Sequence, residues 1–214
     1  MEPQHRTYTA FAGTRLLGIG PLEQVVLLIK DRADQGETER LAFFDNETGQ
    51  VLDLDLRGTP AETLARLAEH PALAPVAEEK VEKRSGPGRP KLGVVSREVS
   101  LLPRHWAWLG EQRGGASVTL RKLVDDARKR SEGRDRARKA KEAAHRFMWE
   151  LAGNLPQFEE ASRAFYANDT AAFGRLVTAW PEDIRRHLEW LVERAADLER
   201  EAEAETELAS KAAQ

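Results

Sequence analysis

Residues 72–92 restrict the fold more than any other stretch of the sequence. Prolines and glycines crowd this stretch, among them Pro75, Gly86, Pro87, Gly88 and Pro90. Proline removes a backbone donor and glycine loses entropy in a regular conformation, so no helix or strand is expected to run through it. The Glu and Lys residues between them have little apolar surface to bury. We therefore expect a basic Pro/Gly linker over 72–92 that divides the 214 residues into two structured parts.

The part before the linker, residues 1–71, has the pattern of a small α+β domain. Short apolar stretches at 8–12, 15–19 and 41–44 predict strands, and an apolar stripe after Pro21 predicts a helix. Residues 51–56 alternate leucine with aspartate, which predicts a return strand beyond a hairpin loop at 45–49. Thr59 and Glu62 have the spacing of a capping box, which predicts a second helix.

Residues 132–198 are expected to form a helical domain. Gly153 suits a helix end, Asp169 suits an N-cap and Pro181 suits a helix start. The five tryptophans of the chain occur at helical spacing with other apolar residues and are expected in the core. Residues 199–214 are acidic and alanine-rich without an apolar stripe, so we expect a disordered tail. The fold class is therefore α+β, mostly helical, with a C-terminal helical bundle.

Charge is distributed unevenly along the chain. Residues 1–79 carry 7 Lys/Arg and 14 Asp/Glu, residues 80–146 carry 19 and 8, and residues 147–214 carry 7 and 14. A block with a net charge of +11 thus lies between two blocks of −7 each. This asymmetry indicates an anionic partner for the basic middle, or acidic arms that shield it.

Residues 93–131 have the pattern of a short strand followed by two helices. Alternating apolar residues at 94–101 predict the strand, Pro103 opens the first helix, and Gly114 and Gly115 mark the turn before the second. A single strand of this length must pair with another, either in a sheet or in a second chain. The segment resembles the ribbon-helix-helix DNA-binding fold. Ordinary core packing of the same strand and helices is the alternative.

The ribbon-helix-helix resemblance implies a homodimer that binds duplex DNA. The strands at 96–101 of two copies would form one antiparallel ribbon, with Ser96, Glu98 and Ser100 facing the major groove. A carboxylate facing DNA is unfavourable unless it accepts from cytosine, so Glu98 departs from the expected pattern. Ser117 would cap the second helix, whose N-terminus holds a phosphate with help from Arg121 and Lys122.

A second basic motif precedes this segment. Residues 84–91 include Arg84, Arg89 and Lys91, and the Gly-Arg-Pro-Lys sequence at 88–91 resembles half of an AT-hook. Prolines keep such an arm extended, and arginine is attracted to the negative potential of a narrow minor groove. A plain basic linker is the alternative. Further Lys and Arg residues at 128–130 and 134–141 would add contacts to phosphates, which do not distinguish one DNA sequence from another. A solvated helix face is the alternative for these residues.

Stretches along nearly the whole chain resemble one bacterial family, a domain of unknown function of the type numbered 2239. These stretches are Tyr-Thr-Ala-Phe-Ala-Gly at 8–13, Asp-Leu-Asp-Leu-Arg-Gly at 53–58, Gly-Arg-Pro-Lys-Leu-Gly-Val-Val at 88–95, Leu-Leu-Pro-Arg-His-Trp at 101–106 and Phe-Met at 147–148. The resemblance implies no particular activity.

Motifs for catalysis are lacking in the sequence. The chain has no cysteine, its five histidines lack metal-ligand spacing, and no phosphate loop or nucleophile elbow occurs. We expect no enzyme activity, no cofactor and no bound metal. No apolar run approaches the ~20 residues of a membrane span, so we expect a cytoplasmic protein. The leading hypothesis is a homodimeric DNA-binding protein of the transcriptional-regulator class. The alternative is a non-catalytic dimerising protein whose basic segment meets an acidic protein or its own acidic tail.

Overall fold

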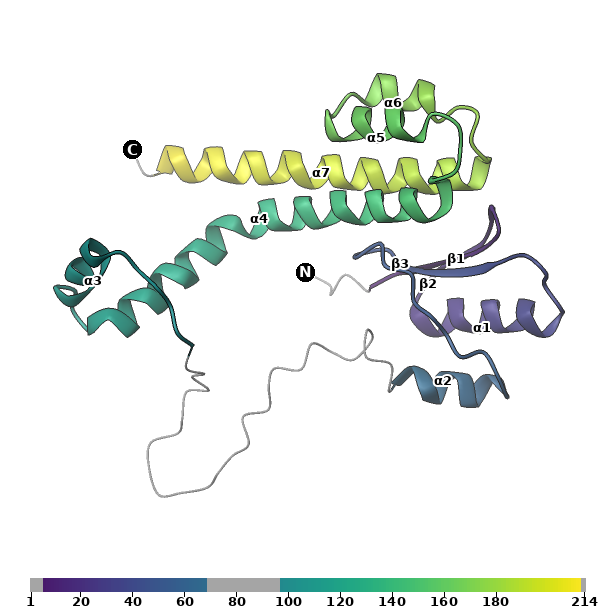
Figure 1. Ribbon diagram of the computed structural model, residues 1–214, viewed down its shortest axis with the longest axis horizontal. Helices are drawn as coiled ribbons and strands as arrows, with labels where there is room; N and C mark the ends of the chain where they lie inside the picture. The colour runs from purple at the N-terminus through teal and green to yellow at the C-terminus, as the bar shows by residue number, and fades with distance from the viewer. Residues whose placement is uncertain (1–5, 69–96, 213–214) are drawn as a thin grey trace, which may run out of the picture. The chain divides into compact units, whose positions relative to one another are not determined.

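A computed structural model describes residues 6–68 and 97–212 of the chain (Figure 1). The fold is α+β, as expected from the sequence, with a three-stranded sheet and seven helices among the described residues. The described residues form two compact units. One unit combines 6–68 with 132–212, and the other contains 97–131. The long helix α4, Gly115–Ala152, contributes to both units.

The sheet consists of β1 (Tyr8–Ala12), β2 (Arg15–Gly20) and β3 (Leu41–Asp45) in the order β2-β1-β3. All three strands were predicted, and both pairings are antiparallel. The turn between β1 and β2 places Gly13 at a φ of 56°, a conformation that favours glycine.

Helices α1 (Leu22–Asp34) and α2 (Pro60–Ala68) also form where the sequence predicts them. At the start of α2 the Glu62 N–H donates to Thr59 Oγ1 at 3.3 Å, and the Thr59 N–H donates to Glu62 Oε2 at 2.7 Å. These reciprocal bonds confirm the capping box.

The return strand predicted over 51–56 is wrong. Only Val51 forms an isolated bridge, with Phe44, and residues 52–57 have no regular structure. Leu52 is buried, and Leu54 and Leu56 both pack against the same core cluster, so the leucines enter the core without a ladder beside β3.

The C-terminal helices are α5 (Phe158–Tyr166), α6 (Thr170–Leu176) and α7 (Glu182–Ala212). Asp169 caps α6 as predicted, because its Oδ1 accepts the Ala172 N–H at 2.8 Å. The expected disorder after residue 199 is wrong, since α7 continues to Ala212. Ala202 is buried, and a Cβ placed on Gly133 of α4 would lie 3.2 Å from Ala202 Cβ, so contact with α4 supports this end of α7.

The core lies on both faces of the sheet. Tyr8 and Phe43 pack with α1, whereas Phe11 and Phe44 pack with residues of α4 to α7. Phe147 of α4 approaches Phe11 and Phe44, with ring centroids 5.6 and 5.0 Å apart. Successive side chains of β1 and β3 point to opposite faces of the sheet, so the two strands contact α1 on one face and the C-terminal helices on the other. Figure 1 shows α1 and α4 on the two sides of the sheet.

His187 of α7 is the most unusual polar residue of this core. Its side chain is 3 % exposed, and neither ring nitrogen has a hydrogen-bond partner among the described residues. The rings of Phe147, Trp190 and Phe11 surround it, with centroids 4.7, 5.4 and 5.9 Å away. Burial lowers the pKa of His187 to about 4.

Residues 97–131 contain α3 (Pro103–Gly110) and the N-terminal part of α4. Pro103 opens α3 and two glycines precede the body of α4, as predicted. The predicted strand is wrong in its described part, because residues 97–102 have no regular structure. The ribbon-helix-helix resemblance loses its defining strand there, since no described strand lies beside residues 97–102 to pair with them.

Candidate nucleic-acid interface

Residues 121–130 of α4 form a segment whose side chains are exposed on every side of the helix. It carries five cations and two carboxylates, and we call the five cations the free cation group: Arg121, Lys122, Arg128, Lys129 and Arg130. None of them forms an ion pair with a carboxylate of the described residues. The side-chain Nε atoms of Arg121 and Arg130 donate only to backbone carbonyls one turn earlier, at 3.2 Å each. This group can therefore accept an anion without breaking an existing pair.

The predicted site residues of the strand and the cap behave differently from expectation. Glu98 and Ser100 are exposed but lie on no strand, so they cannot form the expected ribbon surface. Ser117 does not cap the second helix, because α4 begins at Gly115 and includes it. Gly114 and Gly115 turn the chain where predicted, with φ values of 91° and 74°, but the helix begins two residues before the predicted cap. The Ser117 carbonyl instead accepts the Arg121 Nε–H.

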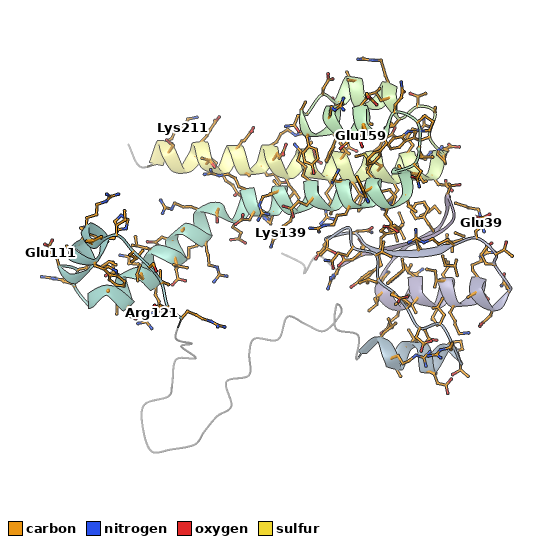
Figure 2. The ribbon with its side chains drawn as sticks, in the orientation of Figure 1. Glu39, Glu111, Arg121, Lys139, Glu159 and Lys211 are labelled. Atoms are coloured by element: carbon orange, nitrogen blue, oxygen red, sulfur yellow. The ribbon has the colours of Figure 1, made fainter. Side chains whose placement is uncertain are left out.

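Four of the predicted DNA contacts cannot be located in the structure. Arg84, Arg89, Lys91 and Ser96 lie outside the described residues. Arg121 and Lys122 are described, and both are exposed on α4. Figure 2 shows the side chains of Arg121 and Lys139 projecting from this helix.

The cations at 134–141 are in a different environment from the free cation group. Arg136 lies 3.6 Å from Glu205 of α7, and Lys141 lies 3.5 Å from Glu199 of the same helix. Arg138 pairs within α4, and the hydrogen bonds that its guanidinium donates to Glu142 and then to Asp135 raise its pKa. The second half of the basic block is therefore largely matched by carboxylates.

A groove of about 630 Å³ runs between α4 and α7. Arg134, Arg138 and Lys141 line its α4 wall, and Glu199, Glu203 and Glu207 line its α7 wall. The two helices lie side by side in Figure 1. A smaller cavity of about 220 Å³ adjoins it beside Phe165 and Phe173. Lys141 reaches both spaces, with its ammonium 2.5 Å from Asn168 Oδ1 and 5.6 Å from the Phe165 ring centroid.

Apolar side chains are exposed where the sequence predicted a core. Of the five tryptophans only Trp180 is buried, and Trp106 and Trp108 of α3 are 45 % and 48 % exposed. Leu109 is the one fully buried apolar residue among 97–131. The exposed ones are Val99, Leu102, Trp106, Trp108, Val118, Leu123 and Val124. Helical spacing alone cannot distinguish these residues from core residues. It shows that they share one face of a helix, but it does not show whether another part of the protein covers that face.

Catalytic and metal-binding arrangements are sparse in the described part of the chain. Ser162 Oγ lies 3.3 Å from His145 Nε2, and burial lowers the pKa of His145. No described carboxylate bonds to His145, so the pair lacks the third group that orients a base toward a nucleophile. Residues 6–68 and 97–212 hold no group of three or more metal-ligating side chains. No helix within these ranges is long and apolar enough to cross a membrane.

Comparison with known proteins places the chain in a family. No curated protein and no solved structure matches it. A family model matches residues 7–192, which include every described stretch on which the sequence resemblance rests. That model carries the description "Uncharacterized protein conserved in bacteria (DUF2239)". The chain therefore belongs to this bacterial family, as the resemblance predicted.

Proposed function

We propose that this protein binds duplex DNA through the free cation group of α4. The observation that carries the proposal is the absence of carboxylate partners for these five cations among the described residues, on a helix segment exposed all round. Phosphates are strong acceptors for arginine and lysine, and binding them releases condensed counterions from DNA. Unpaired exposed cations lose little when they bind a phosphate, whereas paired ones must first lose a carboxylate.

The positions of the charges on α4 support one contact face. At 100° per residue, Arg121, Lys122, Arg128 and Lys129 project to one side of the helix. Leu123, Val124 and Ala127 project to the other side, with Leu120. Asp125 and Asp126 lie within the basic side and oppose an approaching phosphate. The net charge of 121–130 is +3, so attraction to DNA prevails.

The apolar side of the same segment supports self-association. Among residues 97–131, α3 and the N-terminal part of α4 bury only Leu109. Leu123, Val124 and two tryptophans of this segment stay exposed, and an exposed apolar patch of this kind indicates a binding partner. A second copy supplies the same apolar stripe and can meet it in a two-fold arrangement. Arg121, Lys122, Arg128 and Lys129 lie on the opposite side of α4, so such a dimer leaves these four cations open to DNA. This dimer uses helices in place of the strand expected from the sequence.

The alternative function, an interaction protein with an acidic partner, also has an observation in its favour. Arg136 and Lys141 already pair with carboxylates of a helix, which is how an acidic protein segment would contact α4. Carboxylates and phosphates differ in the salt dependence of their binding, because only DNA carries a condensed counterion atmosphere. A role in transcriptional regulation would require a preference for particular DNA sequences, and contacts between cations and phosphates alone do not provide such a preference.

The test uses the full chain and a random-sequence duplex in fluorescence anisotropy at about 0.1 M salt. We expect Arg121→Ala/Lys122→Ala and Arg128→Ala/Lys129→Ala each to weaken binding by about tenfold or more, since each phosphate contact contributes roughly a tenfold factor there. The control is Arg163→Ala/Arg186→Ala, which removes two exposed cations that pair with Glu160 and Glu182. Equal affinity of all three variants would overturn the assignment to α4.

A further inference from the structure

The groove between α4 and α7 brings opposite charges together in register. Arg134, Arg138 and Lys141 repeat at intervals of four and three residues, and Glu199, Glu203 and Glu207 repeat at intervals of four. These spacings keep each set on one side of its helix. Two contacts cross from helix to helix, Arg136 to Glu205 at 3.6 Å and Lys141 to Glu199 at 3.5 Å. The acidic end of α7, defined here as residues 199–207, therefore lies along the second half of the basic block.

Close backbone approach fixes this register. Gly133 of α4 faces Ala202 of α7, and a Cβ on Gly133 would come within 3.3 Å of Ala202 Cα. Ala137 and Ala140 are buried on α4, and Ala202 is buried on α7. Small residues allow the two helices to approach, and the longer charged side chains then meet at the rim of the seam.

The acidic end of α7 is held weakly compared with the rest of that helix. Ile184, Leu188 and Leu191 are buried in the main core, whereas no described side chain of α7 beyond Ala202 is buried. Leu208 is 68 % exposed. The Arg136–Glu205 pair near this end is exposed, with its side chains at 47 % and 61 %, and exposed pairs contribute little. The Lys141–Glu199 pair is more covered, at 17 % and 34 %, and lies at the start of the acidic end. This end can therefore separate from α4 without disturbing the core.

We propose that the acidic end of α7 acts as a built-in competitor of nucleic acid for the cations of α4. Its glutamates occupy Arg136 and Lys141 in the positions that phosphates would take. The free cation group makes the first contact with DNA, and release of the acidic end then adds the cations at 134–141. The inference rests on the proposed DNA binding and assigns its regulation to α7.

The experiment compares two double variants of the full chain that remove the same charge from the same helix. Glu199→Gln/Glu205→Gln removes the two carboxylates that cross to α4. The control, Glu189→Gln/Glu193→Gln, removes two exposed carboxylates that line neither the groove nor the cavity. Glutamine keeps the helix propensity of glutamate, so both variants should fold.

We expect the first variant to bind a random duplex roughly 3–10-fold more tightly than wild type at low salt, with a slope of log affinity against log salt steeper by up to about two. The control should change affinity less than twofold. Equal gains in both variants would overturn the inference and indicate a net-charge effect. Unchanged affinity in the first variant, with wild type still binding DNA, would overturn the inference and leave the proposed function standing. No binding by wild type or either variant would overturn both.

Hydrogen exchange provides a second measurement that net charge does not affect. On addition of duplex DNA to wild type, backbone amides of residues 203–211 should exchange faster, because release from α4 exposes that end of α7 to fraying. Amides near Leu188 should be unchanged, since that turn is buried in the core. Slower exchange or no change at 203–211 in the DNA complex would contradict release.

Discussion

Gly133 of α4 and Ala202 of α7 lie so close that one added carbon on Gly133 would sit 3.2 Å from the Ala202 Cβ. A larger residue at Gly133 must push α7 away from the basic helix. Gly133→Leu should therefore lower the free energy of unfolding by about 1–3 kcal/mol despite the better helix propensity of leucine. Urea unfolding of the full chain measures this loss.

A matched control separates packing from helix propensity. Gly174 of α6 has open space where its Cβ would lie, so Gly174→Ala should stabilise the protein by up to about 1 kcal/mol. Gly133→Leu should also raise affinity for DNA, because it loosens the acidic end of α7. A Gly133→Leu protein that is as stable as wild type would show that the two helices do not approach closely.

The burial of His187 makes stability depend on pH. Its folded pKa of about 4 lies below the ordinary value of 6.5, so the folded state binds the proton less readily than the unfolded chain. The stabilisation is complete above pH 6.5 and is lost as the pH falls toward 4. Acidification from pH 7 to pH 5 should therefore lower the free energy of unfolding by about 2 kcal/mol through His187.

Chemical denaturation at the two pH values, with His187→Phe as the variant, measures this contribution. Phenylalanine keeps an aromatic ring among Phe11, Phe147 and Trp190 but cannot be protonated. We expect the variant to lose about 2 kcal/mol less than wild type on acidification. The same pH dependence in both proteins would locate the titrating group elsewhere.

Local signals in the sequence predicted much of the fold. The Thr59–Glu62 capping box and the Asp169 cap form as expected because each depends on residues within one helical turn. The failures concern contacts between distant segments. Residues 97–102 form no strand, since alternation indicates a strand only where a partner is available. The helix after residue 199 depends on contact with Gly133, about seventy residues earlier, which periodicity in the tail cannot reveal.

The candidate site was predicted in its chemistry and only partly in its geometry. Charge counts located the basic block, and the free cation group lies within it. Pairing of Arg136 and Lys141 with α7 could not be foreseen, because i,i+4 rules consider only acids on the same helix. Trp106 and Trp108 were expected in a core but are exposed, because residues 97–131 supply too few apolar partners to bury them.

Removal of the acids within the basic side of α4 should strengthen DNA binding. Asp125 and Asp126 lie between the cations at 121–122 and 128–129, and neither forms a described ion pair with them. Asp125→Asn/Asp126→Asn should raise affinity for a random duplex by roughly tenfold at 0.1 M salt, because two like charges no longer face the phosphates. Unchanged affinity would mean that this side of α4 does not face DNA.

The apolar side of α4 should control self-association. Leu123 and Val124 are 43 % and 55 % exposed, so Leu123→Gln/Val124→Gln should leave a single chain folded and abolish dimerisation in sedimentation analysis. The control is Leu27→Gln/Leu208→Gln, which changes two exposed apolar residues outside 97–131. A wild-type protein that stays monomeric at high concentration would remove the dimer from the account.

The dependence of duplex DNA affinity on salt tests the central claim most directly. Four phosphate contacts, by the cations of the free cation group that share one side of α4, contribute about −3.6 to the slope of log affinity against log salt. Replacement of Arg121, Lys122, Arg128, Lys129 and Arg130 with glutamine should flatten the slope by about that amount. The thermal midpoint should stay close to that of wild type, because these side chains are exposed. A slope that is equally steep in wild type and the five-site variant, or no binding by wild type at low salt, would contradict the account.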